Sequence, residues 1–162
     1  MPIGFDLQPW YLATLAVAEQ LYDSLIVWNS QGSITITSVS QPFFSTFVSG
    51  ISTGTYPSDS STFSTLTSSI RSFADSFAAI VAKYTPTNGG LSEQFDKNTG
   101  VPVSAVDLTW SYASLLTSGM ARGGVASASW GASGLTVPSQ CSTGPDPIPF
   151  TFKEFATTQF GG

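Results

Sequence analysis

The sequence has no histidine and only one cysteine, Cys141, in its 162 residues. Without histidine the chain cannot build a Ser-His-Asp triad, a Cys-His dyad or a zinc site of cysteines and histidines. A lone cysteine also gives no disulfide within the chain. We therefore expect no metal and no cofactor, and any acid-base chemistry must be done by carboxylates.

Charged residues are scarce as well. Five Lys or Arg and ten Asp or Glu make up 9% of the chain, with a net charge of -5, whereas soluble domains average roughly 25%. Because Lys and Arg contacts to phosphates dominate nucleic-acid affinity, we expect no nucleic-acid binding. No apolar run reaches the roughly 18 to 20 residues that span a bilayer, so we expect no membrane partner. Serine and threonine supply most of the polarity.

The start of the chain resembles a secretory signal only in part. Residues 10–18 are apolar and end in Ala16-Val17-Ala18, as at a cleavage site. A signal peptide also needs a positively charged beginning, but residues 1–8 contain Asp6 and no Lys or Arg. We therefore interpret this segment as a helix.

Four stretches of the sequence have a helical pattern. Apolar residues at spacings of three and four predict helices over residues 10–29, 40–51, 63–84 and 104–116. Ser104 followed by Asp107 is similar to a capping box and predicts the start of the last helix. Alternation around Ile34 and Ile36 predicts a short extended segment. We expect loops at 54–61 and 91–100, irregular chain over 119–140 and one C-terminal strand near residues 150–155. The predicted fold class is all-α.

The polar loop Leu91–Gly100 is the first candidate for chemistry. It holds Glu93 and Asp96 between two glycine turns, and loops on rigid scaffolds often carry catalytic groups. The alternative is that both acids are simply solvated.

Other candidates are aromatic side chains and one pair of acids. Tryptophan rings can stack on sugar rings or can be packed in a core; the four are Trp10, Trp28, Trp110 and Trp130. Glu19 and Asp23, one helical turn apart, could form a carboxylate pair or a solvated stripe.

Several segments, in order, resemble the fungal glucoamylases, glycoside hydrolase family 15. The first runs from Trp10 to Asp23, and the second is Gly90-Leu-Ser-Glu-Gln-Phe-Asp-Lys97. The third is Ser104-Ala-Val-Asp-Leu-Thr-Trp-Ser-Tyr-Ala113, and a Pro-Ser-Gln-Cys141 segment follows. The second and third motifs at this separation make the resemblance specific.

The resemblance implies a fold and an activity. Family members have an (α/α)6 toroid of twelve helices, of which this chain would supply about four. They remove glucose from the non-reducing ends of starch and maltooligosaccharides with inversion, as glucan 1,4-alpha-glucosidases. Glu93 matches the general base, Ser104 matches a serine beside it, and Trp110 matches a wall of the sugar pocket. Trp10 matches another residue near substrate, although the family's Asn-Pro-Trp reads Gln8-Pro9-Trp10 here.

The resemblance also implies that parts are missing. Inversion needs a second carboxyl group roughly 6.5 to 9.5 Å from the base, and the family's Trp-Glu-Glu motif that supplies the acid does not occur in this sequence. Twelve helices of about 11 residues with loops of about five need ~190 residues, more than the 162 of this chain. Cys141 matches a cysteine that in the family bonds to one far upstream.

We therefore expect an incomplete, secreted-type glucoamylase chain with little activity of its own. Residues 1–141 would be the C-terminal third of the catalytic domain, 142–149 a linker, and 150–162 the start of a family 20 starch-binding domain. Its expected partners are starch or maltooligosaccharide and the upstream part of the catalytic domain. Two alternatives stay open: a non-catalytic carbohydrate-binding remnant and a structural remnant without ligand.

Overall fold

The computed structural model describes residues 7–126, which are mainly helical as the sequence predicts. The expectations for Trp130, Cys141, the linker at 142–149 and the strand near residue 150 lie outside the described residues. The elements, in chain order, are α1 (Tyr11–Gln31), β1 (Ser33–Ile36), α2 (Gln41–Ser45), β2 (Gly54–Pro57), α3 (Ser61–Tyr84), β3 (Gln94–Phe95), β4 (Pro102–Val103) and α4 (Thr109–Arg122).

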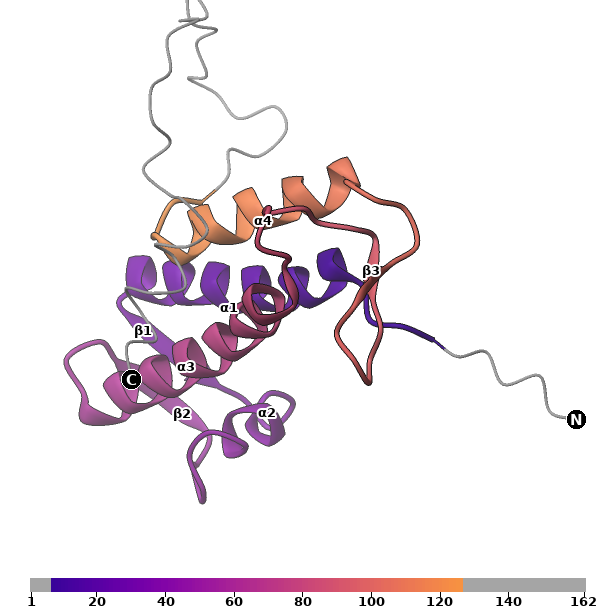
Figure 1. Ribbon diagram of the computed structural model, residues 1–162. Coiled ribbons are helices and arrows are strands. Elements are labelled where there is room, and N and C mark those ends of the chain that lie inside the picture. Colours follow the sequence, from indigo (N-terminus) through magenta and orange to yellow (C-terminus); the bar gives the residue numbers. More distant parts are fainter. Residues whose placement is uncertain (1–6, 127–162) are drawn as a thin grey trace, which may run out of the picture. The chain divides into compact units, whose positions relative to one another are not determined.

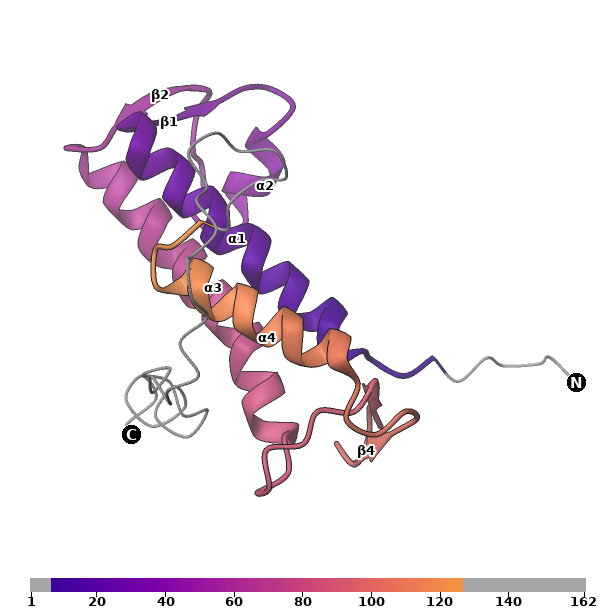
Figure 2. The same ribbon diagram turned by 90° about the horizontal axis from the view of Figure 1, so that it is seen from above.

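Three long helices form the body of the structure. α1 packs against both α3 and α4, and it lies between them in Figure 1. α1 and α4 run in the same direction, and α3, which lies between them in the sequence, runs in the opposite direction. α1 and α4 therefore begin at the same end of the structure (Figures 1 and 2). The apolar face of α3 carries the longest row of buried residues, which are Phe63, Leu66, Ile70, Ala74, Ala78 and Val81.

A two-stranded sheet lies at the other end of α1. β1 and β2 pair antiparallel, with Ile34 opposite Tyr56. The side chains of Ile34 and Ile36 are buried in the same core as Leu25 and Phe44. Because alternate residues of a strand face opposite sides, the alternation seen around Ile34 is what places both isoleucines in the core.

A partly buried ionic cluster joins the three helices. The carboxylate of Asp75 on α3 accepts hydrogen bonds from the Tyr22 hydroxyl on α1 (2.6 Å) and from Nε of Arg122 on α4 (2.8 Å). Burial and the hydrogen bond to Asp75 raise the pKa of Tyr22, so its phenol remains a donor. Removing one partner leaves the other charge partly buried and without this ion pair, so the cluster favours this arrangement of the helices.

Four sequence-based boundaries were wrong. The last helix begins at Thr109 and not at Ser104, because Ser104 and Asp107 adopt left-handed φ angles of 68° and 53°. It also continues to Arg122, past the point where irregular chain was expected. The helix expected over 40–51 is only the short α2 followed by turns, and the loop expected at 54–61 begins with β2, which pairs with β1.

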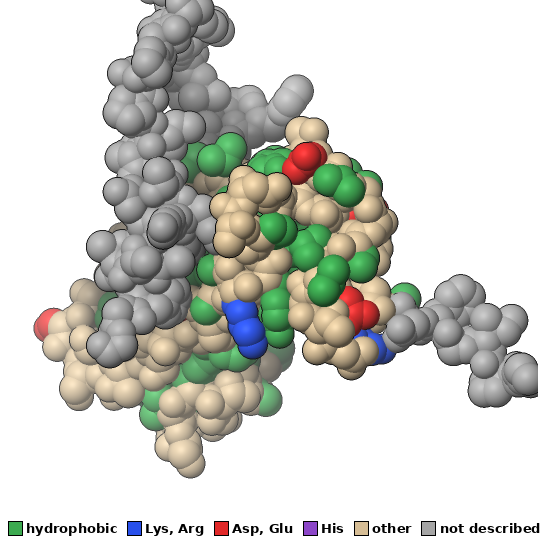
Figure 3. All heavy atoms as spheres, in the orientation of Figure 1, with side chains coloured by type: hydrophobic (Ala, Val, Ile, Leu, Met, Phe, Trp, Pro, Cys, Tyr) green, Lys and Arg blue, Asp and Glu red, His purple; other side chains and the backbone are tan. Residues whose placement is uncertain are grey.

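One face of the structure exposes aromatic rings. The rings of Phe43, Phe47, Phe73 and Phe77 form a row of edge-on contacts, with centroids 5.1 to 5.5 Å apart. Phe43 is 42% exposed and Phe73 44%. Figure 3 shows hydrophobic side chains reaching the surface in several places, among few charged groups.

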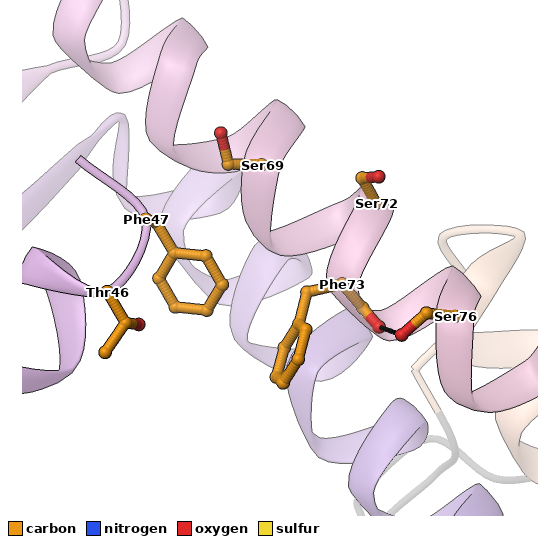
Figure 4. Close-up of a pocket in the computed structure, with 6 residues that line it drawn as sticks. All are labelled: Thr46, Phe47, Ser69, Ser72, Phe73 and Ser76. Atoms are coloured by element: carbon orange, nitrogen blue, oxygen red, sulfur yellow. Dashed lines mark hydrogen bonds between the residues drawn. The ribbon is translucent and has the colours of Figure 1, made fainter.

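A hollow of about 570 Å³ opens beside this row (Figure 4). The rings of Phe47 and Phe73 face it from the segment after α2 and from α3, and hydroxyl side chains complete its lining. The hydroxyl-bearing residues are Thr46, Ser69, Ser72 and Ser76. None of the residues predicted for chemistry lines this hollow, so the hollow is separate from the candidate site.

The exposed phenylalanine row predicts self-association, because contiguous apolar patches are uncommon on monomeric proteins. We expect the double variant Phe43→Ser with Phe73→Ser to sediment closer to the monomer mass than the unsubstituted chain does. Sedimentation velocity over a concentration series measures this. Phe63→Ser, at a buried position of α3, is the contrasting control, since it should destabilise the fold by about 3 to 5 kcal/mol. Identical sedimentation of the double variant and the unsubstituted chain would contradict the prediction.

Candidate active site

The backbone of Glu93 is held from two sides. Its amide donates a hydrogen bond to the carbonyl of Ala105 (2.8 Å), in the loop before α4, and its carbonyl accepts one from the amide of Tyr11 (3.2 Å), the first residue of α1. Next to it, Gln94 forms an antiparallel bridge with Trp10. Glu93 therefore lies at the end of the structure where α1 and α4 both begin (Figure 1).

The side chain of Glu93 is held by Ser104. The Ser104 hydroxyl donates a hydrogen bond to Oε2 of Glu93. Ser104 has a φ of 68°, a conformation that costs a residue with a Cβ roughly 1 to 2 kcal/mol. Strain of this kind is often found at functional sites. The Glu93 side chain is only partly buried, so its carboxylate is both oriented and reachable by water.

The loop that carries Glu93 is closed by aromatic packing. Phe95 is 4% exposed and contacts the rings of Tyr11 and Tyr84, at centroid distances of 5.0 and 5.1 Å. The Tyr11 hydroxyl donates to the carbonyl of Tyr84 (2.6 Å), the last residue of α3. At Gly100, which has a φ of 74°, an added Cβ would lie 1.9 Å from the Tyr84 ring. Sequence reasoning missed the contacts of Tyr11 and Tyr84: Tyr84 was predicted only as the last residue of the apolar stripe over residues 63–84, and Tyr11 had no signal beyond its place in the 10–29 helix.

Asp96 has a structural part in this loop. Its Oδ1 accepts hydrogen bonds from the amides of Asn98 (2.9 Å) and Thr99 (2.7 Å) and from the Thr99 hydroxyl (2.9 Å). The hydrogen bonds from Thr99 and Asn98 lower the pKa of Asp96 below its ordinary value. An acid stabilised as the carboxylate is a poor proton donor. The hydrogen bonds of Asp96 instead stabilise the turn at residues 96–99.

The three tryptophans within residues 7–126 divide into two kinds. Trp110, the second residue of α4, is 64% exposed, and Trp10, which precedes α1, is 37% exposed. Core packing therefore does not account for either one. Trp28 is partly buried and packs on Phe44, at a centroid distance of 5.6 Å, so for Trp28 the core interpretation is confirmed.

Glu19, one of the two acids considered on α1, takes part in a contact between helices. Glu19 accepts a hydrogen bond from the Thr117 hydroxyl (2.6 Å), which joins α1 to α4.

Within residues 7–126 no group of three or more potential metal ligands comes together. None of the helices in the same range is long and apolar enough to cross a membrane.

The four predicted site residues thus come from segments that meet at one end of the helices. Glu93 and Ser104 are in direct contact, and Trp10 is bridged to the residue after Glu93. Trp110 follows within the first turn of α4. The family model for "Glycosyl hydrolases family 15" matches residues 4–120. The chain belongs to glycosyl hydrolase family 15.

Relatives in family 15 agree with this assignment. Glucoamylase-1 of Schizophyllum commune is 54% identical over 165 residues, covering 98% of this chain and 29% of the relative. A glucoamylase of Neurospora crassa is 55% identical over 141 residues, covering 86% of this chain and 22% of the relative. This chain therefore spans less than a third of the length of these curated relatives.

A solved family 15 structure confirms the fold. The glucoamylase from Hypocrea jecorina matches with a TM-score of 0.74 and 51% identity, over 83% of this chain and 23% of that one. Glucoamylase of Hormoconis resinae matches with a TM-score of 0.69 and 40% identity, over 74% and 21% of the two chains. The described helices are thus part of the helical toroid of this family.

The contact between Gly100 and Tyr84 predicts a large effect for Gly100→Ala. Alanine would meet both the left-handed backbone and the Tyr84 ring, so we expect a loss of roughly 2 to 5 kcal/mol in the free energy of unfolding. Gly50→Ala is the matched control, because Gly50 has a φ of 73° with no atom within 4 Å of an added Cβ. Urea denaturation of both variants measures the difference, and equal losses would show that the ring contact contributes nothing.

Proposed function

We propose that this chain supplies the general-base half of a glucoamylase active site, with Glu93 as the base. The observation that carries the proposal is the hydrogen bond from Ser104 to a partly exposed Glu93 carboxylate. This pair lies where α1 and α4 begin, in a chain that belongs to family 15. The substrates we propose are starch and maltooligosaccharides, from whose non-reducing ends glucose is released.

The proposed chemistry is hydrolysis with inversion. A carboxylate takes a proton from a water molecule while that water attacks the anomeric carbon, and an acid on the opposite face protonates the leaving oxygen. Glu93 suits the first role because its carboxylate is fixed by Ser104 and its backbone is fixed to both neighbouring segments. The product of such an attack on an α-glucoside is β-glucose.

The acid half of the reaction is not assigned to this chain. Asp96 is stabilised as a carboxylate by its turn, and Asp107 accepts a hydrogen bond from Tyr112. The Trp-Glu-Glu motif that the family resemblance calls for is absent from the sequence. We therefore propose that a longer glucoamylase chain supplies the acid and that the 162-residue chain alone hydrolyses little or no substrate.

Trp10 and Trp110 are proposed to line the sugar site. Both rings are exposed and stand at the starts of α1 and α4, next to Glu93 in the fold. Aromatic rings with one face open to solvent suit the apolar faces of sugars. The same exposure favours a second candidate function, which is sugar binding without hydrolysis.

The proposed organisation extends to the remainder of the chain. Residues 1–141 would be the C-terminal part of the catalytic domain, 142–149 a linker and 150–162 the beginning of a starch-binding domain. The match to the Schizophyllum commune relative supports continuity, since it covers 98% of this chain. We propose a secreted enzyme, as the family resemblance implies.

The proposal predicts binding without turnover. Titration of the 162-residue chain with maltooligosaccharides should change its tryptophan fluorescence, and Trp110→Ala should remove most of that change, because Trp110 is the more exposed of the two rings. Trp28→Phe is the control, since Trp28 packs within the core. A titration that leaves the fluorescence flat would contradict the sugar site.

A hydrolysis assay tests whether the 162-residue chain lacks the acid. The proposal expects no release of glucose from maltose by this chain beyond the uncatalysed rate. Release at an enzymatic rate that is lost in Glu93→Gln would overturn the statement that the acid lies elsewhere.

A further inference from the structure

Three consecutive residues before and at Glu93 are bonded to the segment that starts α4. The carbonyl of Leu91 accepts from the amide of Leu108 (2.9 Å), and the carbonyl of Ser92 accepts from the hydroxyl of Ser111 (2.8 Å). Leu91, Ser92 and Ser111 are all buried. These hydrogen bonds to the start of α4 therefore fix the position of the Glu93 peptide.

Tyr112 adds a side-chain bridge to this attachment. Its hydroxyl accepts a hydrogen bond from the amide of Leu91 (3.0 Å) and donates one to Oδ1 of Asp107 (2.6 Å). The hydrogen bond to Asp107 raises the pKa of the Tyr112 phenol, so the hydroxyl keeps the proton that it donates. One hydroxyl thus joins the residue two before Glu93 to the loop that carries Ser104.

Asp107 is the residue that shapes this loop. It has a φ of 53°, and Ser104 three residues earlier has a φ of 68°. Aspartate and asparagine tolerate this left-handed conformation better than other residues with a Cβ. On the other side, Gly90 leaves room for the Asp107 carboxylate, since a Cβ there would lie 3.2 Å from Oδ1.

We propose that Tyr112 and Asp107 are positioning residues for the general base: their hydrogen bond locks the turn that presents the Ser104 hydroxyl to Glu93. The two residues belong to the same Asp-Leu-Thr-Trp-Ser-Tyr motif, and the bridge explains why an acid and a tyrosine occur five residues apart in it. Neither side chain takes part in the reaction itself. That Glu93 acts as a base rests on the proposed function, whereas its placement by this bridge does not.

The test follows Glu93 directly by NMR in the complete 162-residue chain. The sequence has only three glutamates, Glu19, Glu93 and Glu154, so carboxyl-labelled glutamate gives a spectrum simple enough to assign. Ser104→Ala removes the donor to Glu93 and defines how far the Glu93 carboxyl resonance moves when the hydrogen bond is lost. Tyr112→Phe, which keeps the ring and removes the hydroxyl, should move that resonance in the same direction. It should also speed hydrogen exchange of the Glu93 amide roughly tenfold.

Asp107 gives a second, independent pair of variants. Asp107→Asn keeps a hydrogen-bond acceptor and the left-handed backbone, so it should leave the Glu93 resonance close to its unsubstituted position. Asp107→Gly keeps the backbone without strain but removes the acceptor, so it should reproduce the shift of Tyr112→Phe. Tyr56→Phe is the matched control for loss of a tyrosine hydroxyl, because the hydroxyl of Tyr56, in β2, donates to the carbonyl of Ser52 (2.9 Å). It should leave Glu93 unchanged.

The proposal is overturned if Tyr112→Phe leaves the Glu93 resonance and amide exchange unchanged while Ser104→Ala moves the resonance. Should Tyr112→Phe fail to fold, the Asp107 pair decides: a Glu93 resonance that stays in place in Asp107→Gly overturns the proposal, and one that moves only in Asp107→Gly supports it. None of these readouts needs sugar or turnover. Failure of the bridge is therefore distinguishable from failure of the proposed function, which would appear as a flat maltooligosaccharide titration.

Discussion

The peptide of Glu93 is bonded on one side to the first residue of α1 and on the other to the loop before α4, and the rest of the candidate site depends on this arrangement. A carboxylate on a free loop would sample many positions, whereas this one is fixed by elements that are themselves packed together. Because α1 and α4 run in the same direction, both of their starts meet at Glu93 (Figure 1). The exposed rings of Trp10 and Trp110 come from these same starts.

The helices are held in that arrangement by their own contacts. Apolar residues of α3 pack on α1, and the Asp75 carboxylate joins α3 to both other helices through Tyr22 and Arg122. Such a cluster favours one pairing of the helices because another pairing would separate a partly buried charge from its partner. The exposed phenylalanine row on the α2 and α3 side takes no part in the site. The fold thus fixes the candidate site at one end of the three helices and leaves another face apolar.

The sequence predicted what depends on local spacing. The apolar stripe of α3, the buried pair Ile34 and Ile36, and the helical nature of α1 all follow from periodicity. It mispredicted Ser104 as a helix cap, since capping residues are identified by type, and the hydroxyl instead bonds Glu93 eleven residues away. The bridge between Tyr112, Asp107 and Leu91 was also missed, because it depends on two left-handed residues that no periodicity indicates. Glu93 itself could be chosen over Asp96 only through its motif.

The central claim is that this chain contributes a correctly placed base to an inverting glucoamylase whose acid comes from another part of the polypeptide. It is tested most directly by joining residues 1–162 to the upstream portion of the Schizophyllum commune relative, of which this chain covers 29%, and following maltose hydrolysis by proton NMR. The account predicts that the glucose first released by the joined protein contains more of the β anomer than equilibrated glucose does, because only the non-reducing-end sugar is inverted, and that Glu93→Gln abolishes the release while the fold is retained. Hydrolysis that persists in Glu93→Gln, or glucose first released with more of the α anomer than equilibrated glucose, would contradict it.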